Sequence, residues 1–528
     1  MAIFLCDADS CRGESLLTVL RRLGFVLDSD CAAAGRCGRC RVEVAPLDAP
    51  DRFESVLACA TVIDRDLIVR VPEPARGDEN EDFRVVVECL GTVYPGTVCP
   101  GTVCSGTVCS GGRWVAAVDL GTTTLAAALI DVDTGEWLYR AACRNPQRRF
   151  GTDLLSRIQA AGTPDGVFRL RRLLLDAVGA LLEELISHLP SGAALERVAV
   201  AGNSVMTLLF HGLDPTPMGR IPFEPPAYEF PPVTAEELHW PLPPRIPVLT
   251  LPLLARFVGG DLTAGLLLLR QRGHLPAPEP VLLIDLGTNG EIVLVRGGRV
   301  LAASTAAGPV FEGGHIHSGS MAVPGAIDHV DFTAKPPIHT IGDLPAAGLC
   351  GSGLFDTVAE LSRVGVLLPS GRFVPPAADL PLPEQTTLEE REGQRTFFLT
   401  DSRAPKAIAV TQSDIRQFQL AIGAMKAGVT ILLRRAGIEN GEPLRLYVAG
   451  ALGTHLNYSS ARRVGLFPGT LTDEYLSYLG NSSLQGAALV ACSPELIEAA
   501  SEARHLTETV DLAGDPRFEE EFVRSMRF

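Results

Sequence analysis

One stretch of sequence occurs twice in this chain of 528 residues, and it limits the folds that the chain can adopt. The apolar run Val115-Ala-Ala-Val-Asp119 predicts a buried strand that ends in a carboxylate and continues into the turn Asp-Leu-Gly-Thr. The run Val281-Leu-Leu-Ile-Asp285 enters the same turn 166 residues later. Each turn precedes a second predicted strand, over 125–132 and 291–295. Repetition of one strand–turn–strand unit predicts internal duplication of a half-domain, in a multidomain chain of α/β and α+β class.

Both turns have the chemistry of a nucleotide phosphate site. A carboxylate at the end of a buried strand can hold a Mg²⁺ ion or its waters, so Asp119 and Asp285 are the candidate carboxylates. The glycine of each turn lets backbone N–H groups approach phosphate oxygens, and the threonine hydroxyls add donors. Two such turns that face each other across a cleft would clamp a triphosphate. A predicted strand at 446–449, with Gly450 and Gly453 behind it, would press against the adenosine.

Four cysteines near the front of the chain predict a metal centre. Cys31, Cys37 and Cys40 lie within ten residues and Cys59 follows, which gives the pattern C-x5-C-x2-C…C. This is close to the C-x4-C-x2-C…C pattern that holds a plant-type 2Fe–2S cluster, where a tight loop supplies three thiolates and a separate segment the fourth. Zinc is one alternative, although zinc sites usually have two C-x2-C pairs and this stretch has one. Unpaired core cysteines are the other, although thiols are not normally buried in a loop rich in Gly and Arg.

The residues around these cysteines predict a small ferredoxin-like module over 1–75. Residues 1–6, 41–44 and 67–71 have the pattern of short strands. Residues 14–23 carry apolar side chains at helical spacing. Short strands and one helix around a cysteine loop are what a ferredoxin needs.

The composition of residues 76–112 predicts that they form an exposed linker between this module and the duplicated part. They continue a stretch rich in Pro, Glu and Asp, and then repeat a Gly-Thr-Val pentapeptide four times. A low-complexity tether is the favoured interpretation, and a second metal site is the alternative, because the repeat spaces three cysteines five residues apart: Cys99, Cys104 and Cys109. Beyond the linker we expect two subdomains, over 113–277 and 278–528.

The charge of the chain argues against a nucleic-acid binder. Its formal net charge of −16 leaves no basic excess to neutralise phosphates. Hydrophobic residues make up 46% of the chain, so it can bury several cores. No apolar run reaches the length needed to cross a bilayer, and residues 1–15 lack the pattern of a secretory signal. We therefore expect a cytoplasmic protein with no membrane partner.

Three motifs carry a resemblance to a known clan of proteins. Residues 118–124, 284–291 and 449–453 resemble the phosphate-1, phosphate-2 and adenosine motifs of the actin-like ATPases, which include acetate and sugar kinases, chaperone ATPases and actin. With the cysteine module in front, further stretches make the chain similar to one branch, the reductive activators of corrinoid proteins. These stretches are 145–147, 151–158, 202–207, 259–261, 307–313, 348–353, 414–415 and 419–421. The resemblance extends from the first strand to residues 465–468.

The resemblance implies roles for particular residues. Cys31, Cys37, Cys40 and Cys59 would ligate a 2Fe–2S cluster in a β-grasp ferredoxin-like domain. The duplicated part would be two actin-like subdomains of the RNase H type, which bind ATP and Mg²⁺. The implied nucleotide residues are Asp119, Gly121, Thr122 and Thr123 for one side of the phosphates, Asp285, Gly287, Thr288 and Asn289 for the other, and Gly450 and Gly453 for the adenosine.

The activity implied by the resemblance is ATP-dependent reduction of cob(II)amide to cob(I)amide. The implied partners are a corrinoid protein of a methyltransferase system and a low-potential electron donor, and the family also implies homodimers. Two features depart from the family pattern. The loop after Cys31 has the sequence Ala-Ala-Ala-Gly instead of a Gly-rich run, which would alter hydrogen bonds to the cluster. Residues 506–528 contain no cysteine, unlike related activators with extra C-terminal clusters.

Two other functions remain open on the sequence. One is a small-molecule kinase of the same clan, with the cysteine module as a redox sensor. The chain shows no obvious aspartate base motif on the substrate side, which counts mildly against it. The other is a nucleotide-gated chaperone for a corrinoid methyltransferase, in which the cluster has only a structural role.

Overall fold

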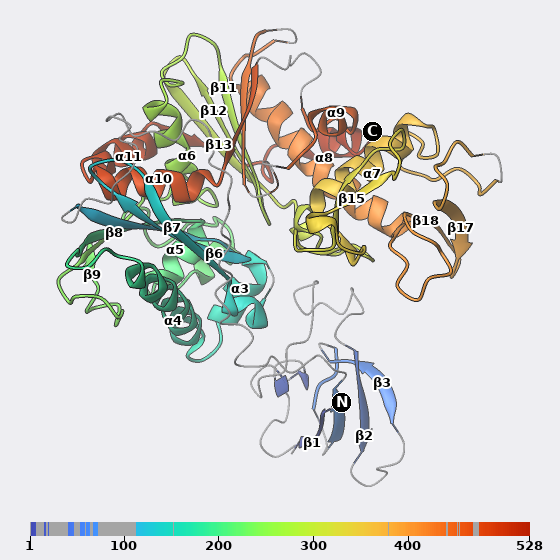
Figure 1. The fold of residues 1–528 in the computed structure, drawn as a ribbon, viewed down its shortest axis with the longest axis horizontal. Coiled ribbons are helices and arrows are strands. Elements are labelled where there is room, and N and C mark those ends of the chain that lie inside the picture. Colours follow the sequence, from blue (N-terminus) through green and yellow to red (C-terminus); the bar gives the residue numbers. More distant parts are fainter. Residues whose placement is uncertain are drawn as a thin grey trace. The chain divides into compact units, whose positions relative to one another are not determined.

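The fold is that of a computed structural model (Figure 1). The structure describes residues 2–6, 15–16, 19–20, 41–46, 53–58, 60–63, 67–71 and 112–528, apart from 152, 378–379, 440–441, 451, 453–454 and 468–474. The chain forms two compact units. The first comprises Met1–Asp261 with Ala487–Ile497, and the second comprises Leu262–Gly486 with Glu498–Phe528.

A four-stranded antiparallel sheet lies at the start of the chain. Its strands follow the order β1 (Ala2–Cys6), β4 (Leu67–Val71), β2 (Arg41–Pro46) and β3 (Glu54–Leu57). The strands predicted at 1–6, 41–44 and 67–71 are confirmed, and β2 runs two residues further than expected. Leu16 and Leu20, in the predicted helical stretch, are helical and fully buried.

The first unit also contains a six-stranded mixed sheet. Its central strand is β5 (Trp114–Leu120), whose apolar residues are buried because strands flank it on both sides and helices cover the sheet. On one side follow β6 (Thr124–Asp131) and β7 (Trp137–Arg144), each antiparallel to its neighbour. On the other side lie the parallel strands β8 (Leu195–Gly202) and β10 (Pro247–Thr250), with β9 (Val233–Thr234) at the edge.

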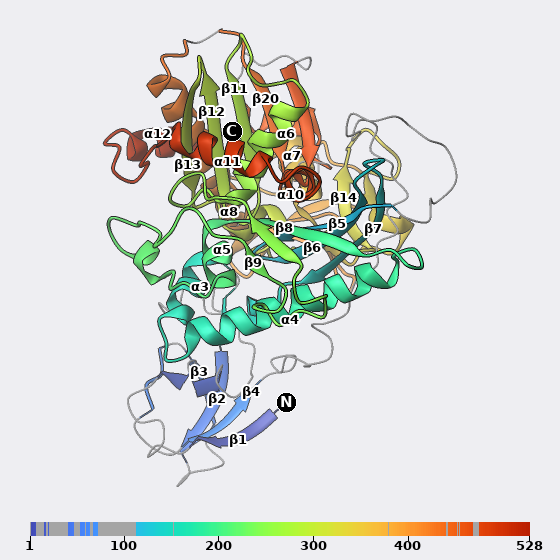
Figure 2. The same ribbon diagram turned by 90° about the vertical axis from the view of Figure 1, so that its left-hand side faces the viewer.

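Helices cover this sheet and shape its end. The long helix α4 (Gly166–Ser187) packs along β6 and β7 through one leucine face, since its buried residues recur at helical spacing (Figure 2). Three short elements lie near the end of β5: the 3₁₀ helix η1 (Pro146–Phe150), α3 (Leu154–Ala161) and α5 (Ser204–Phe210). The 3₁₀ helix η2 (Thr216–Gly219) packs against α3, and α6 (Gly260–Gln271) leads into the second unit.

The second unit repeats the same sheet. Its central strand β11 (Val281–Leu286) has antiparallel β12 (Gly290–Arg296) and β13 (Arg299–Thr305) on one side. Parallel strands β20 (Arg445–Ala449) and β21 (Leu476–Gly480) lie on the other, and β22 (Thr507–Thr509) adds to β13. Five strands of each six-stranded sheet thus share one spatial order and one set of directions: β5, β6, β7, β8 and β10 correspond to β11, β12, β13, β20 and β21. The predicted duplication is confirmed.

Two small sheets and several helices complete the second unit. Strands β14 (Ala326–Val330), β15 (Ile338–Thr340) and β16 (Gly348–Leu349) form one sheet, and β17 (Thr387–Arg391), β18 (Gln394–Phe398) and β19 (Ala409–Thr411) form the other. The remaining elements are η3 (Pro309–Glu312), η4 (Ile341–Asp343), α7 (Gly351–Arg363), α8 (Gln412–Arg435), α9 (Tyr458–Arg463), α10 (Ser482–Cys492), α11 (Leu496–His505) and α12 (Phe518–Ser525).

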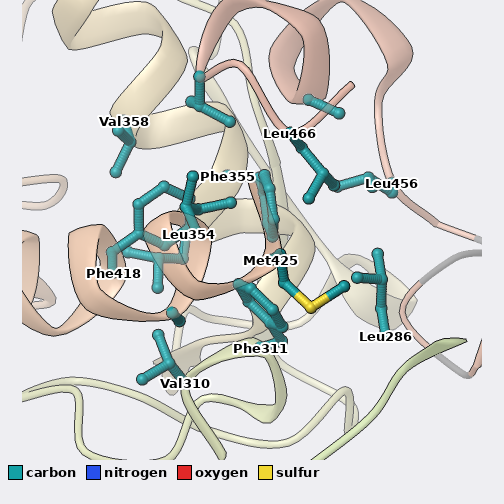
Figure 3. Close-up of a cluster of buried hydrophobic side chains, with 14 of the residues drawn as sticks. Leu286, Val310, Phe311, Leu354, Phe355, Val358, Phe418, Met425, Leu456 and Leu466 are labelled. Atoms are coloured by element: carbon teal, nitrogen blue, oxygen red, sulfur yellow. The ribbon is translucent and has the colours of Figure 1, made fainter. Parts of the chain in front are cut away.

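The core of the second unit lies where α7 and α8 meet the end of β11. Phe311, Phe355 and Phe418 pack together there, with ring centroids 4.8 Å apart between Phe355 and Phe418 (Figure 3). Met425 of α8 lies beside Phe311 and Leu286 in the same view. This aromatic packing holds η3 and α8 in place behind the second Asp-Leu-Gly-Thr turn.

Among the residues that the structure describes, no helix has both the length and the apolar character of a membrane span.

Candidate functional site

The two Asp-Leu-Gly-Thr turns occupy equivalent points of the two six-stranded sheets. Asp119 is the last residue but one of β5, and Asp285 is the last but one of β11. In each sheet the neighbouring parallel strand, β8 or β20, ends beside this aspartate. Both carboxylates are half-buried. The duplication therefore places one carboxylate at the same carboxyl-terminal edge of each sheet, which is where α/β sheets bind ligands.

In the first turn, the side chain of Thr122 contacts the start of α5. Thr122 is 7% exposed, and its Oγ1 accepts a hydrogen bond from Nδ2 of Asn203 at 2.9 Å. The Oδ1 of Asn203 accepts from the backbone N–H of Met206 and so caps α5. Because the hydroxyl of Thr122 accepts in this contact, its own hydrogen stays available to donate to another group.

Three successive carbonyl groups of the first turn accept hydrogen bonds from one side. Nδ2 of Asn145 donates to the carbonyl of Gly121 at 2.8 Å, and its backbone N–H donates to that of Thr123 at 2.9 Å. Nη2 of Arg157, on α3, donates to the carbonyl of Thr122 between them. Asn145 and Arg157 are both buried. The backbone of the turn is therefore held by Asn145 and Arg157, which lie outside it.

The glycines of the two turns differ in what surrounds them. A Cβ added to Gly121 would lie 2.2 Å from the carbonyl oxygen of Thr124, so this position requires glycine within the protein itself. A Cβ added to Gly287 would meet nothing closer than 3.6 Å. Glycine at 287 thus leaves space that the described part of the protein does not fill.

The second turn uses its polar groups differently from the first. Thr288 is 5% exposed, and its Oγ1 lies 3.0 Å from Oε1 of Glu312, at the end of η3. An ionised carboxylate only accepts, so the hydroxyl of Thr288 donates here. The backbone N–H of Gly287 donates to the carbonyl of Asn289 at 3.1 Å. We predicted Thr288 as a phosphate donor; in this structure its hydroxyl hydrogen is already used within the protein.

The glycine after β20 lies against the second turn. Gly450 has a φ of +92°, and an added Cβ would lie 2.7 Å from Oδ1 of Asp285 and 2.8 Å from the carbonyl of Leu286. Parallel pairing of β20 with β11 sets Ala449 beside Asp285, which explains the close approach. The two segments around residues 285 and 450, which were predicted separately, therefore lie directly against each other.

The remaining predicted site residues lie outside the residues that the structure describes. These are the four candidate cluster ligands Cys31, Cys37, Cys40 and Cys59, the glycine Gly453, and the repeat cysteines Cys99, Cys104 and Cys109. Within the described ranges, no group of three or more His, Cys, Asp or Glu side chains is arranged to hold a metal ion.

Four residues that shape these turns were not among the predicted site residues, namely Asn145, Arg157, Asn203 and Glu312. Each lies in a stretch that carried the resemblance (145–147, 151–158, 202–207 or 307–313), but nothing in the spacing assigned it a contact. A second signal was available for Arg157, because an arginine on the apolar face of a short helix is rarely left buried without partners.

Two buried carboxylates of the second unit lie further along the chain. Asp414 completes a capping box with Thr411 at the start of α8, and its Oδ1 accepts from the backbone N–H of His317 at 2.8 Å. Asp356 of α7 accepts from the hydroxyl of Ser460 on α9 at 2.5 Å. Burial raises the pKa of both carboxyl groups, and these hydrogen bonds oppose the rise. Both residues tie loops and helices together.

Two protein-family models together match most of the duplicated part of the chain. Residues 114–271 match the family described as the RACo middle region, and residues 279–528 match the one described as the C-terminal domain of RACo, the ASKHA domain. ASKHA denotes the actin-like ATPase clan. The chain is also 32% identical over 426 residues to the corrinoid activation enzyme RamQ of Eubacterium limosum, which covers 78% of this chain and 70% of that protein.

The chain belongs to the family of reductive activators of corrinoid proteins. A second relative in this activator family is the [Co(II) methylated amine-specific corrinoid protein] reductase of Methanosarcina barkeri, 25% identical over 70% of this chain and 68% of that one. A solved structure of a reductive activator for corrinoid,iron-sulfur protein aligns over 99% of this chain and 96% of its own, with 28% identity and a TM-score of 0.70. The activator is thus a mixed α/β multidomain protein with an actin-like ASKHA domain.

Proposed function

We propose that this activator reduces cob(II)amide on a corrinoid protein of a methyltransferase system to cob(I)amide, one electron at a time, with hydrolysis of ATP. The observation that carries the proposal is the pair of Asp-Leu-Gly-Thr turns at equivalent points of two duplicated sheets, in a chain of the corrinoid activator family. A low-potential protein would donate the electrons, and a homodimer is the expected assembly. A cytoplasmic location is part of the proposal, because thiols stay reduced there.

The nucleotide would bind at the two turns with its Mg²⁺. Asp119 and Asp285 would hold the ion or its waters, and Gly121, Thr122 and Thr123 would contact phosphate on one side. Gly287, Thr288 and Asn289 would contact it on the other side, and Gly450 and Gly453 would border the adenosine. Two observations agree with this proposal: the space left at Gly287 and the close approach of Gly450 to Asp285.

The electrons would pass through a cluster at the front of the chain, in a β-grasp ferredoxin-like domain. Cys31, Cys37, Cys40 and Cys59 offer four thiolates, which is the donor set of a 2Fe–2S centre. When bound, such a centre supplies single electrons. The four-stranded sheet β1–β4 has the predicted strands of that module.

A need for ATP follows from redox arithmetic. A plant-type cluster has a potential of about −400 mV, and cob(I)amide is a stronger reductant than this. Every ~59 mV of mismatch lowers the equilibrium constant of a one-electron step tenfold. Nucleotide binding would favour a complex of the activator with the corrinoid protein in which cobalt is easier to reduce, and hydrolysis would release the pair.

The test uses the full chain, reconstituted anaerobically with iron and sulfide. Cob(II)amide-loaded corrinoid protein and a chemical low-potential reductant are added, and cob(I)amide absorbance is followed with Mg·ATP, with Mg·ADP and without nucleotide. We expect cob(I)amide to accumulate only with ATP, and an Asp119→Asn variant to show little of this effect. Equal rates with and without ATP would contradict the proposal.

A further inference from the structure

The guanidinium of Arg157, the one charged side chain of α3, is fully buried in the first unit. Its side chain has no exposed surface, and its nitrogens contact groups of three segments: η1 with its C-cap, α5 and the first turn. Nε donates to the carbonyl of Gly151 at 3.2 Å, and Nη1 lies 3.2 Å from Oε1 of Gln147 and 3.0 Å from Sδ of Met206. Nη2 donates to the carbonyl of Thr122 in the first turn.

The bond to Thr122 fixes the direction of one peptide plane. In a trans peptide the carbonyl and the following N–H point in opposite directions. Arg157 draws the Thr122 carbonyl toward α3, so the N–H of Thr123 points away from α3. Asn145 does the same to the carbonyl of Gly121, and its Nδ2 lies beside Arg157, since both contact Sδ of Met206, so the N–H of Thr122 is turned the same way. Successive N–H groups that point to one side form a concave site for an anion.

We propose that Arg157 is a positioning residue for the nucleotide: it holds the Thr122–Thr123 peptide with its N–H side toward the phosphates and places a positive charge behind the turn. This inference depends on the proposed binding of nucleotide at the first turn. Arg157 itself does not touch the phosphates. It acts through the backbone of Thr122 and, in a low-dielectric interior, through its charge.

Packing alone does not account for an arginine at this place. A buried charge is costly unless it is hydrogen-bonded, and an apolar side chain could fill the space between α3, η1 and α5. The fork of the guanidinium instead reaches carbonyls of two loops and a glutamine at once, which a lysine cannot do. Such a geometry orients a backbone rather than only filling a core.

A matched control is present on α4. Arg171 is also partly buried in the first unit, and its Nε donates to a backbone carbonyl, that of Phe210, at 3.0 Å. That carbonyl is at the end of α5, outside the first turn. Arg171→Lys therefore removes a comparable arginine–carbonyl bond without touching the turn.

The experiment measures the Kd of Mg·ATP by calorimetry, KM and kcat for ATP hydrolysis, and the Tm, for the reconstituted full chain. We expect Arg157→Gln to weaken ATP binding about 100-fold, because it removes both the charge behind the turn and the guanidinium's bond to the Thr122 carbonyl. Arg157→Lys keeps the charge, so we expect a loss of about tenfold. In both variants KM should rise more than kcat falls. Arg171→Lys should stay within about twofold of the wild type in all these quantities.

The outcomes distinguish failure of the role inferred for Arg157 from failure of the proposed function. If the wild type binds ATP and folded Arg157→Lys and Arg157→Gln bind it equally well, the inference is wrong while the proposed function stands. If the wild type binds no ATP, the proposed function fails and the inference falls with it. Should the Arg157 variants not fold, Gln147→Leu removes the acceptor that orients Nη1; we then expect about a threefold rise in Kd, and an unchanged Kd overturns the inference.

Discussion

Gly121 and Gly287 show two different reasons why a turn can require glycine. At 121 the reason lies in the protein, because a Cβ would collide with the carbonyl of Thr124. At 287 the nearest atom to a Cβ is 3.6 Å away, so the protein would accept an alanine there. If the empty side of Gly287 receives a phosphate, the alanine will disturb the ligand and not the fold.

Paired alanine substitutions test this distinction. We expect Gly121→Ala to lower the free energy of unfolding by about 1–3 kcal/mol, as overpacking does. Gly287→Ala should change it by less than ~0.5 kcal/mol, as substitutions without a clash do. Chemical denaturation of both variants measures these values.

Nucleotide affinity gives the second half of the same test. Gly287→Ala should weaken ATP binding measured by calorimetry, although its stability is unchanged. A Gly287→Ala protein that is both stable and fully competent to bind ATP would mean that no phosphate approaches this glycine.

One helix, α5, depends on a side chain that also holds the first turn. Asn203 caps α5 and also donates to Thr122, so one residue joins the start of a helix to the first turn. Thr411 caps α8 in the other unit, where its side chain forms the capping box with Asp414. The two positions allow the effect of a lost cap to be separated from the effect on the turn.

We expect Asn203→Ala and Thr411→Ala each to cost about 1 kcal/mol of stability, the usual value of an N-cap. Only Asn203→Ala should also raise the Kd of ATP, because it releases the side chain of Thr122. Thermal unfolding and calorimetry on both variants provide the comparison. An equal loss of ATP affinity in the two variants would show that the cap, and not the contact with Thr122, is responsible.

The end of α8 is joined to the start of α12 through one buried carboxylate. Asp515 accepts from Arg517 at 3.2 Å and from Arg435 at 3.3 Å, and its side chain is 2% exposed. The hydrogen bonds from Arg517, with the ion pair to Arg435, hold the pKa of Asp515 well below its usual value of 3.8. A lowered folded pKa means that the carboxylate stabilises the fold above pH 3.8, and that this contribution is lost as the pH falls below it.

Asp515→Asn should therefore lower the Tm most at neutral pH. The difference in Tm between wild type and variant should narrow as the pH is lowered below 3.8, where the carboxylate of the unfolded wild-type chain becomes protonated. Scanning calorimetry from pH 7 downward measures it. A difference that does not change with pH would rule out the ion pairs as its cause.

Strands with a strong hydrophobic pattern were predicted well, and strands without such a pattern were not. The continuous apolar runs of β5 and β11 and the hairpins after them had the expected places, because a central strand is buried on both faces. The small sheets β14–β16 and β17–β19 were not predicted. Their strands have two to five residues and mixed burial, which leaves no periodicity to recognise.

The candidate site was predicted only as far as contacts follow from local sequence. The turn residues Asp119 and Asp285 were found, since each ends a recognisable strand. The contacts of Arg157 with Thr122, and of Glu312 with Thr288, join residues 35 and 24 positions apart. Such contacts depend on how helices pack on the sheet, and a single sequence does not contain this information.

For the whole molecule, the proposal divides the chain into a part that carries electrons and a part that binds ATP. Cys37→Ser should abolish the electron paramagnetic resonance signal of the reduced, reconstituted protein, because a 2Fe–2S cluster needs its thiolate ligands. The Kd of ATP should stay within about twofold of the wild type, since the turns belong to other sheets. Cob(I)amide formation should be lost.

The conservative replacement Cys143→Ser is the control for this variant. Cys143 is buried in β7, where burial raises the pKa of its thiol to about 11, so it is no thiolate donor at neutral pH. Its replacement should leave the resonance signal intact. A signal that survives Cys37→Ser would assign the cluster to other cysteines.

Gly450 has a consequence for how the second unit can respond to its ligand. Gly450 has only a hydrogen atom between its backbone and the carboxylate of Asp285, so there is no side chain that could change its conformation to absorb a displacement. When one of these two segments shifts, the other must shift with it or the two will collide. If nucleotide binds as proposed, its contact with the base at Gly450 and its contact with phosphate at the Asp285 turn are therefore mechanically coupled within this unit.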